Sequence, residues 1–401
     1  MTESALGMQT SALQSPRAAC GRAVKSLPRP PRAVRAAAVR SPVLSSAVQR
    51  SAGSTDKNGA KYLSTWLLKE ELAGRVDNEL AVVLQSISVA CKEISCLVKN
   101  APIAGMTGVA DSTNASGDEQ KKLDLVANDV FCRCVADSGR TGIVVTEEED
   151  TPIAVESTSE GQYIVCFDPI DGSSNIDACV TTGSIFAIYS SEQDSCKVDW
   201  GTDGDEEILE KCLTNVRKSG KELVAAGYCM YSSSTVFMLT VGDGVYGFTL
   251  DSGNTGEFIL SHDNIKIPEP GAGGQKIYSG NNGNVELWAP ELKEYVEHLQ
   301  REGHSYRYIG ALVGDFHRTL LYGGVWLYPP DSKAPQGKAR LLYEVAPMSM
   351  IAEQAGGMST WGPKAADRVL EVVPETVHQK SPMFVGSTGE IKRLQEFLAS
   401  R

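Results

Sequence analysis

Several common signatures are missing from this 401-residue sequence. No uninterrupted apolar run approaches the roughly 18 residues that a membrane-spanning helix needs, which favours a soluble protein. There is no CxxC pair and no Cys/His spacing typical of zinc sites, and the ten cysteines are too scattered for a disulfide scaffold. The GxxxxGKS/T phosphate loop and the dinucleotide glycine fingerprint are also absent. The sequence therefore predicts that most cysteines, Cys196 and Cys212 excepted, are reduced core thiols, and it predicts no standard nucleotide-binding fold.

Acidic side chains are scarce at the start of the chain. Residues 1–53 hold eight Lys and Arg and one acid, Glu3, in a stretch rich in Ala, Ser and Pro without hydrophobic periodicity. This composition is typical of an organelle transit peptide, and the alternative is a disordered tail with no targeting role. Because those residues carry a net charge of +7, the rest of the chain carries −19, against −12 for the whole. Such an acidic protein is a poor candidate for binding nucleic acid or an anionic membrane.

The remainder of the chain mixes helix and strand patterns. Apolar residues recur every three or four positions over 78–100, which predicts an amphipathic helix, and similar patterns occur at 289–300 and 390–400. Short β-branched or aromatic runs predict strands at 142–146, 163–167 and 184–189, and two apolar runs around a glycine turn predict a hairpin over 235–250. A Pro- and Gly-rich segment at 262–276 marks the expected domain boundary. The mixture, without an internal repeat, predicts α/β layers.

Acidic residues recur in motifs of one form, in which an acid follows an expected strand, and the apolar run LLY before Glu344 is read as such a strand. They occur in the motifs GDEQKKLD, GIVVTEEED, YIVCFDPIDGSS and LLYEVAPMS, and they are Asp118, Asp124, Glu147, Glu148, Asp168, Asp171 and Glu344. In α/β sheets, ligands usually bind where strands end. Clustered carboxylates need a counter-charge, and Mg²⁺ is a hard cation that takes carboxylate and carbonyl oxygens. The alternative is that these acids are surface turn residues or helix caps.

The turn after the third of these motifs suits an anion. Gly172, Ser173 and Ser174 lead toward a predicted helix start, where backbone N–H groups and hydroxyls can bind a phosphate. Acids for a metal beside amides for a phosphate indicate metal-assisted phosphoryl chemistry.

With these residues in place, the sequence resembles the fructose-1,6-bisphosphatase family. FDPIDGSSNID is similar to the family signature, and GDEQKKLD, TEEED, YIGALVGDFHRTLLYGG and GKARLLYE follow in the family's order, from about residue 61 to 401. The resemblance implies a layered α/β sugar-phosphatase fold with alternating helix and sheet layers, usually a homotetramer. It divides the chain into a transit peptide (1–55), an N-terminal α/β subdomain with the metal site (56–268) and a C-terminal sugar-phosphate-binding subdomain (269–401). The leader suggests a form from the chloroplast stroma.

The resemblance also implies hydrolysis of the 1-phosphate of fructose 1,6-bisphosphate with two to three Mg²⁺ per subunit. The implied metal ligands are Asp118, Glu147, Asp168, the carbonyl of Ile170, Asp171 and Glu344. Glu148 and Asp124 match residues that help to activate water. The implied substrate-binding residues are Asp171, Gly172, Ser173, Ser174, Asn281, Arg307, Tyr308, Tyr328, Lys338 and Arg340, with Arg307 reaching a neighbouring subunit. His317 is expected to be structural.

Regulation is a further implication of the resemblance. Plastid members suggest a regulatory disulfide between Cys196 and Cys212, which flank an acidic segment expected to be an exposed loop, opened by an f-type thioredoxin. Plastid members carry a third cysteine where this chain has Arg217. At the positions where animal members bind AMP, the chain has Asp77, Asn78 and Gln162, which are unfavourable for a phosphate.

Two other functions compete with this interpretation. A sedoheptulose-1,7-bisphosphatase, or an enzyme with dual specificity, shares the metal site. A catalytically inactive sugar-phosphate sensor would be expected to lack at least one carboxylate of the motifs, and none is missing.

Overall fold

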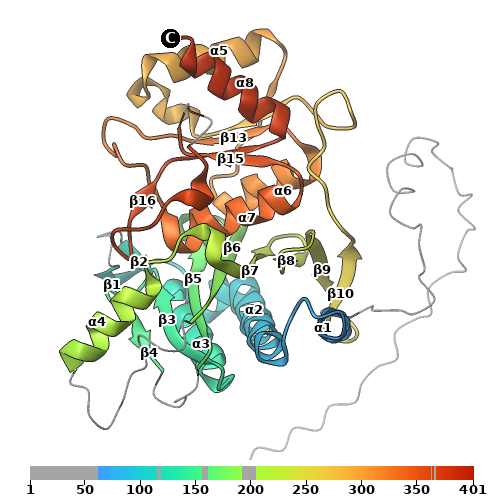
Figure 1. The fold of residues 1–401 in the computed structure, drawn as a ribbon, viewed down its shortest axis with the longest axis vertical. Helices are drawn as coiled ribbons and strands as arrows, with labels where there is room; N and C mark the ends of the chain where they lie inside the picture. The colour runs from blue at the N-terminus through green and yellow to red at the C-terminus, as the bar shows by residue number, and fades with distance from the viewer. Residues whose placement is uncertain (1–61, 115–118, 156–160, 192–204, 363, 365–366) are drawn as a thin grey trace, which may run out of the picture. The chain divides into compact units, whose positions relative to one another are not determined.

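Two β-sheets are stacked between layers of helices (Figure 1). The computed structural model describes residues 62–401 apart from 115–118, 156–160, 192–204, 363 and 365–366. The described residues all lie in one compact unit, which spans Thr55–Arg401. The layered α/β architecture predicted from the sequence is therefore confirmed.

The helices and strands have the following bounds. The α-helices are α1 (Leu63–Leu72), α2 (Asn78–Ala104), α3 (Lys122–Asp137), α4 (Asp205–Val216), α5 (Pro290–Arg301), α6 (Leu312–Tyr322), α7 (Ala346–Gln354) and α8 (Thr388–Ala399). The strands of the larger sheet are β3 (Thr141–Thr146), β4 (Ile153–Ala154), β5 (Tyr163–Asp171), β6 (Thr182–Ser190), β7 (Leu223–Tyr231), β8 (Thr235–Thr240), β9 (Tyr246–Leu250) and β10 (Phe258–His262). The remaining strands are β1 (Val109–Thr113), β2 (Glu119–Lys121), β11 (Ile277–Ser279), β12 (Ser305–Tyr306), β13 (Val325–Tyr328), β14 (Ala339–Arg340), β15 (Met358–Thr360), β16 (Lys380–Ser381) and β17 (Met383–Gly386).

The larger sheet is buried on both faces. Its strand order is β10-β9-β8-β7-β6-β5-β3-β4, and β3 and β5 are its parallel pair. Side chains alternate along a strand, so Ile185 and Tyr189 of β6 pack with α6 and α7, whereas Phe186 and Ile188 pack with α2 and α3. This burial on both faces explains why the strand reads as a continuous apolar run.

Helix α2 supports one face of this sheet. It begins at Asn78, where the carboxylate of Asp77 accepts a hydrogen bond of 2.7 Å from Leu80 N, and ends before Gly105 in the left-handed conformation. By length and composition, α2 is the one helix in the described part of the chain that could cross a bilayer. Its apolar face, however, packs against α3 and β7, as in the core helix of a globular protein.

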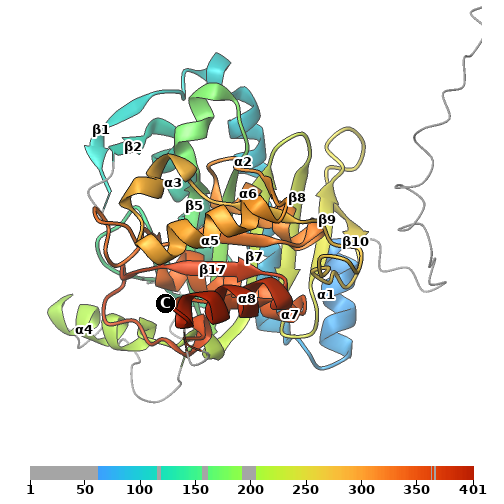
Figure 2. The same ribbon diagram turned by 90° about the horizontal axis from the view of Figure 1, so that it is seen from above.

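The smaller sheet has the order β12-β11-β13-β17-β15 and forms the second sheet layer. Helices α6 and α7 lie between the two sheets, and α5 and α8 cover the outer face (Figure 1). The view from above shows α8 over β17, which it contacts (Figure 2). This arrangement brings the ends of β3 and β5 close to α6, β13 and the segment that follows β14.

The structure corrects the sequence interpretation in two places. The run LLY before Glu344 forms no strand, because residues Leu341–Val345 are a π-helical turn, η4, after the two-residue strand β14. The segment after Cys196 is no exposed loop at its C-terminal end, because 205–216 forms α4 and Cys212 is buried there. Whether the chain divides into subdomains at residue 268 stays a prediction.

Candidate active site

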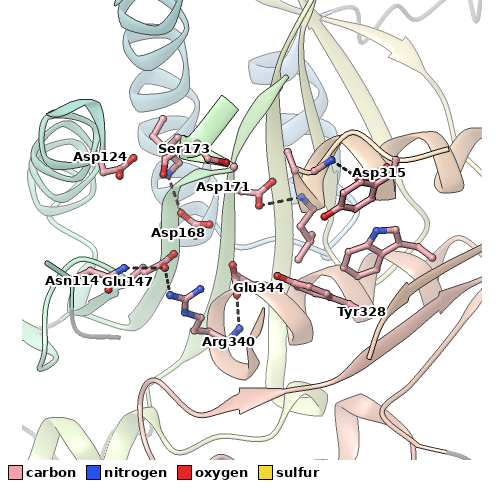
Figure 3. Close-up of a pocket in the computed structure, with 18 of the residues that line it drawn as sticks. Asn114, Asp124, Glu147, Asp168, Asp171, Ser173, Asp315, Tyr328, Arg340 and Glu344 are labelled. Atoms are coloured by element: carbon pink, nitrogen blue, oxygen red, sulfur yellow. Dashed lines mark hydrogen bonds and ion pairs between the residues drawn. The ribbon is translucent and has the colours of Figure 1, made fainter. Parts of the chain in front are cut away.

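A pocket of about 380 Å³ lies where β3 and β5 end, beside the start of α6, β13 and η4 (Figure 3). Among the described residues that line it, seven are acidic and one, Arg340, is basic. An excess of buried carboxylates in one site is unstable without additional positive charge. The lining therefore indicates a site for a cation.

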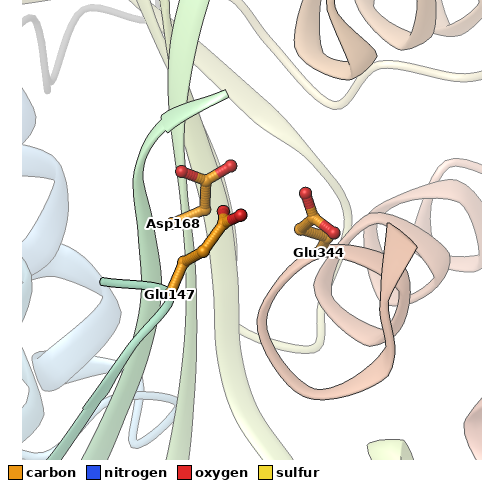
Figure 4. A group of neighbouring side chains, drawn as sticks. All are labelled: Glu147, Asp168 and Glu344. Atoms are coloured by element: carbon orange, nitrogen blue, oxygen red, sulfur yellow. The ribbon is translucent and has the colours of Figure 1, made fainter. Parts of the chain in front are cut away.

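Three carboxylates meet in this pocket. Thr146 of β3 pairs with Phe167 of the parallel strand β5, so that Glu147 and Asp168, the next residues, come side by side. Glu344 reaches them from η4 on the opposite side (Figure 4). One oxygen from each of the three lies within 4.8 Å of the others.

The local electrostatics of this cluster favour a cation. Burial, followed by the charge of Glu344, raises the pKa of Glu147 well above its usual range. Burial and the charge of Glu147 do the same for the pKa of Asp168. Arg340 Nη2 lies 2.5 Å from Glu147 Oε1, and its backbone N–H donates to Glu344. Burial lowers the pKa of Arg340, but the two glutamates outweigh this effect and raise it.

The cluster fits a hard divalent cation. Its donors are all oxygens, they converge from two sides of the pocket, and burial has left them short of positive charge. Mg²⁺ prefers such donors and usually completes its shell with water or a phosphate oxygen. One guanidinium cannot neutralise three carboxylates, so a bound cation would stabilise the whole cluster.

Asp171 lines the same pocket but holds a different position. Its two carboxylate oxygens accept hydrogen bonds from Leu312 N (3.1 Å) and Val313 N (2.8 Å) at the start of α6. Burial raises the pKa of Asp171 to about 7, although these two bonds oppose that effect. Asp171 therefore connects the end of β5 to α6 as well as facing the pocket.

The turn after Asp171 requires a glycine. Gly172 has φ 74°, and a Cβ there would lie 2.6 Å from the Cβ of Ala311. A 3₁₀ helix, η1 (Ser173–Ala178), follows, and Gly172, Ser173 and Ser174 all line the pocket. The predicted phosphate-binding turn thus faces the carboxylate cluster.

Asp124 and Glu148 lie on another side of the pocket. Asp124 is in the first turn of α3, where it accepts a hydrogen bond of 2.7 Å from Lys121 N. Burial raises its pKa to about 7, and the charge of Glu148 adds to the effect. Glu148 accepts a hydrogen bond from Gln120. A carboxyl with a pKa near neutrality can both accept and donate a proton at physiological pH.

The predicted sugar-side residues fall into two groups. Tyr308, Tyr328 and Arg340 line the pocket, with Tyr308 40% exposed. The other three do not line it. Asn281 accepts a hydrogen bond from Gly283 N (3.1 Å). Arg307 is exposed and donates to Tyr306 O (2.7 Å). The third is Lys338, whose Nζ lies 2.9 Å from Asp331.

The pocket-lining residues that the sequence did not predict include three with polar side-chain groups, Asn114, Asp315 and Trp326. Asn114 donates to Glu147 (3.3 Å). Asp315, 1% exposed, accepts from Ile309 N and Gly310 N at 3.0 Å and pairs with Arg318. Asp315 belongs to the motif YIGALVGDFHRTLLYGG, but it lies in a helix, so the search for acids after strands could not find it.

Two expected site residues are outside the described part of the chain, and a third lines the pocket. Asp118 and Cys196 lie outside the described residues. Ile170 lines the pocket, at the register shift between Asp168 and the end of β5. Outside the pocket, His317 is half-buried and its Nδ1 lies 2.8 Å from Tyr228 Oη.

Comparison with known proteins identifies the family. Residues 62–263 match "Fructose-1-6-bisphosphatase, N-terminal domain" and residues 272–399 match "Fructose-1-6-bisphosphatase, C-terminal domain". The chain is 54% identical over 344 residues to "Fructose-1,6-bisphosphatase, chloroplastic" of Triticum aestivum, covering 84% of this chain and 81% of that protein. It is 51% identical over 361 residues to the protein of the same name from Spinacia oleracea, covering 88% and 85%. The crystal structure of Leishmania major fructose-1,6-bisphosphatase in holo form is similar with a TM-score of 0.77 and 39% identity, covering 85% of this chain and 99% of that one. The chain belongs to the fructose-1,6-bisphosphatase family.

Proposed function

We propose that the protein is a Mg²⁺-dependent phosphatase that hydrolyses the 1-phosphate of fructose 1,6-bisphosphate to fructose 6-phosphate and phosphate. The observation that carries the proposal is the carboxylate cluster of Glu147, Asp168 and Glu344 in the same pocket as the turn Gly172–Ser174. Family membership and the names of the relatives support the substrate. The bound cations would polarise the phosphoryl group and lower the pKa of the attacking water.

Separate groups of residues are proposed to bind the metal, to orient the 1-phosphate and to activate the attacking water. Glu147, Asp168, Asp171, Glu344, Asp118 and the carbonyl of Ile170 are the proposed metal ligands. The turn Gly172–Ser174 orients the 1-phosphate with backbone N–H groups and hydroxyls. Because the pKa of Asp124 is about 7, Asp124 and Glu148 are suited to remove a proton from the attacking water.

We assign binding of the sugar and the 6-phosphate to a second group of residues, of which Arg340 also pairs with Glu147 of the carboxylate cluster. Tyr308, Tyr328 and Arg340 are close enough to contact a ligand there, since all three line the pocket. Asn281 and Lys338, which are not among the pocket-lining residues, complete the set proposed to bind the sugar and the 6-phosphate. Arg307 is exposed, as a residue that reaches into a neighbouring subunit of a homotetramer must be.

We further propose that the enzyme works in the chloroplast stroma, in carbon fixation and starch synthesis. Residues 1–55 would direct it there, and thioredoxin would open a Cys196–Cys212 disulfide. A structural route supports the redox effect: α4, which holds Cys212, packs against β4, and β4 pairs with β3, after which Glu147 follows. Oxidation that displaces α4 would then loosen the metal site, so that Cys196→Ser should be active without a dithiol at low Mg²⁺. Dependence of that variant on dithiol would place the switch elsewhere.

Insensitivity to AMP is also part of the proposal. Asp77, at the position of the family's AMP site, already caps α2 and accepts a hydrogen bond of 2.5 Å from Tyr163 Oη. Its carboxylate would repel a phosphate there. Millimolar AMP should leave the rate unchanged in an initial-rate assay, and strong inhibition would show that this loop does bind the nucleotide.

A substrate panel tests the proposed function. Phosphate release would be measured from fructose 1,6-bisphosphate and sedoheptulose 1,7-bisphosphate, with Mg²⁺ or with a chelator. We expect Mg²⁺-dependent release with a higher kcat/KM for the fructose substrate. A higher value for sedoheptulose bisphosphate would reassign the substrate, and no release from either would support the inactive sensor.

A further inference from the structure

Lys338 forms an ion pair with Asp331, and none of the roles proposed above includes Asp331. Its Nζ lies 2.9 Å from the Oδ2 atom of Asp331. The side chain of Lys338 is 38% exposed, whereas that of Asp331 is 2% exposed. The ammonium group therefore stands where a ligand can reach it, while the carboxylate that holds it is buried.

Asp331 is itself held in place by the backbone. Its Oδ1 atom accepts hydrogen bonds from Lys333 N (2.9 Å) and Ala334 N (2.8 Å). The backbone of Asp331 also exchanges two hydrogen bonds with that of Ala334, at 3.1 and 3.0 Å. With both carboxylate oxygens engaged, Asp331 cannot turn away from Lys338 without breaking this turn.

The loop from Asp331 to Lys338 is fixed to its surroundings on two sides. Ser332 N donates to Leu287 O (3.0 Å). Gly337 has φ 84°, and a Cβ at that position would lie 2.5 Å from Pro382 N, so the chain passes too closely for any other residue. Directly after the loop, β14 pairs with β16, and β14 ends in Arg340, which lines the pocket.

The geometry decides between two roles for the pair. If Asp331 were mobile, it would compete with a phosphate for the ammonium. Because it is buried and held, it instead fixes one of the three N–H groups of Lys338 and leaves two for a ligand. Holding a long side chain in one orientation before the ligand arrives reduces the entropy lost on binding.

We propose that Asp331 is a positioning residue that holds Lys338 for the second phosphate of the substrate and so sets the preference for a bisphosphate over a monophosphate. This inference rests on the proposed function. It concerns the phosphate that is not cleaved, so its effect should appear in KM and not in kcat.

The test compares Asp331→Asn with the wild type on fructose 1,6-bisphosphate and on fructose 1-phosphate, which lacks the second phosphate. The amide oxygen can still accept from Lys333 and Ala334, so the turn is kept, but the charge that orients Lys338 is lost. We expect KM for the bisphosphate to rise about tenfold, as for one charge-assisted hydrogen bond, with kcat within about twofold. KM for fructose 1-phosphate should not change. Calorimetry should show fructose 6-phosphate binding weakened by a similar factor.

Two further variants serve as controls. Lys333→Met removes a positive charge from the same loop at an exposed side chain and should leave both KM values unchanged. Asp331→Glu keeps the charge on a longer stem and should recover part of the lost affinity.

Three outcomes would overturn the inference. An unchanged KM in Asp331→Asn would make the pair incidental, and a lower KM would show that Asp331 competes with phosphate. A fall in kcat with both substrates would mean that the loop acts only as structural support for Arg340. If the wild type releases no phosphate from either substrate, the proposed function fails, and the calorimetric comparison still decides the role of Asp331.

Discussion

The two walls of the pocket are built in different ways. The acid wall consists of Glu147, Asp168 and Glu344, whose side chains are buried and meet within 4.8 Å. The sugar wall consists of Tyr308 and Tyr328, of which Tyr308 is 40% exposed. Lys338, whose side chain is 38% exposed, lies outside the pocket lining. The register of parallel strands positions two members of the acid wall, whereas loops and a short strand position the sugar wall.

This difference predicts different consequences of mutation. A buried carboxylate that holds a cation contributes to the charge distribution of the transition state, so its loss should lower kcat. A half-exposed group that contacts the sugar or the uncleaved phosphate contributes similarly to the ground state and the transition state, so its loss should raise KM.

The largest effect is expected on the acid wall. Asp168→Asn replaces a proposed metal ligand by a neutral amide that can still accept from Ile170 N, as Asp168 Oδ1 does at 2.9 Å. Because metal stabilisation is worth several kcal/mol, kcat should fall more than about 100-fold while the fold is retained. Asp263→Asn, the same change at an exposed residue, should have full activity. A kcat above about one tenth of wild type in Asp168→Asn would contradict the expectation that the acid wall determines kcat.

The second effect is expected at Asp315, because it holds the segment of Ile309 and Gly310 that follows Tyr308 of the sugar wall. It accepts hydrogen bonds from Ile309 N and Gly310 N and pairs with Arg318 (2.6 Å). Asp315→Asn leaves a partly buried guanidinium without its counter-charge, which should cost about 3 kcal/mol of unfolding free energy. Urea unfolding measures this loss, and KM should rise with it because Tyr308 precedes the segment. Wild-type stability in this variant would show that the segment is held by other contacts.

His317, on the helix that joins the walls, should make the stability of the fold depend on pH. Burial lowers its pKa from 6.5 to about 4. Between these values the unfolded chain binds the proton more readily, so the stabilisation is fully present above about pH 6.5 and is lost as the pH falls toward 4. At about 1.4 kcal/mol per pH unit, the loss reaches about 3 kcal/mol.

The variant His317→Asn isolates that contribution, since an amide can still pair with Tyr228 but does not titrate. Urea unfolding from pH 7 to pH 4 should show a shallower loss of stability in the variant than in the wild type. An equal loss of unfolding free energy with pH in the two proteins would contradict the assignment of this pH dependence to His317.

The smallest effect is expected on the sugar wall. Tyr328→Phe removes a single hydroxyl from a ring that also contacts Trp326, with ring centroids 5.1 Å apart, so the packing should be kept. One neutral hydrogen bond to substrate is worth about 1 kcal/mol, which predicts a rise in KM of about fivefold with kcat unchanged. Steady-state kinetics would detect the opposite pattern, a lower kcat at constant KM, which would move Tyr328 to the chemical step.

The sequence predicted the acid wall better than the sugar wall, for a physical reason. Glu147 and Asp168 follow apolar runs, and parallel strands bring such residues together. Glu344 was also expected in the site, but its π-helical turn was not, because an apolar LLY run fits a buried strand and a buried turn equally well. Local patterns therefore predict residues positioned by strand register and fail where a short irregular turn positions them.

The remaining failures concern contacts between distant segments. Asp315 follows no strand, and its importance arises from backbone groups of a preceding loop. Lys338 was identified by resemblance to the family, yet its buried partner Asp331 carries no signal in the sequence apart from charge. Cys212 is buried because α4 packs against the core, which the acidic, glycine-containing segment before it does not indicate.

The account depends most on the carboxylate cluster being a cation site that catalysis requires. Binding of Mn²⁺, as a paramagnetic substitute for Mg²⁺, would be measured by electron paramagnetic resonance in the wild type and in Glu344→Gln, alongside phosphate release from fructose 1,6-bisphosphate. We expect saturable binding and activity that rise together in the wild type, and weaker binding with more than about 100-fold lower activity in the variant. Full activity in the presence of a chelator, or equal Mn²⁺ affinity in the two proteins, would contradict the account.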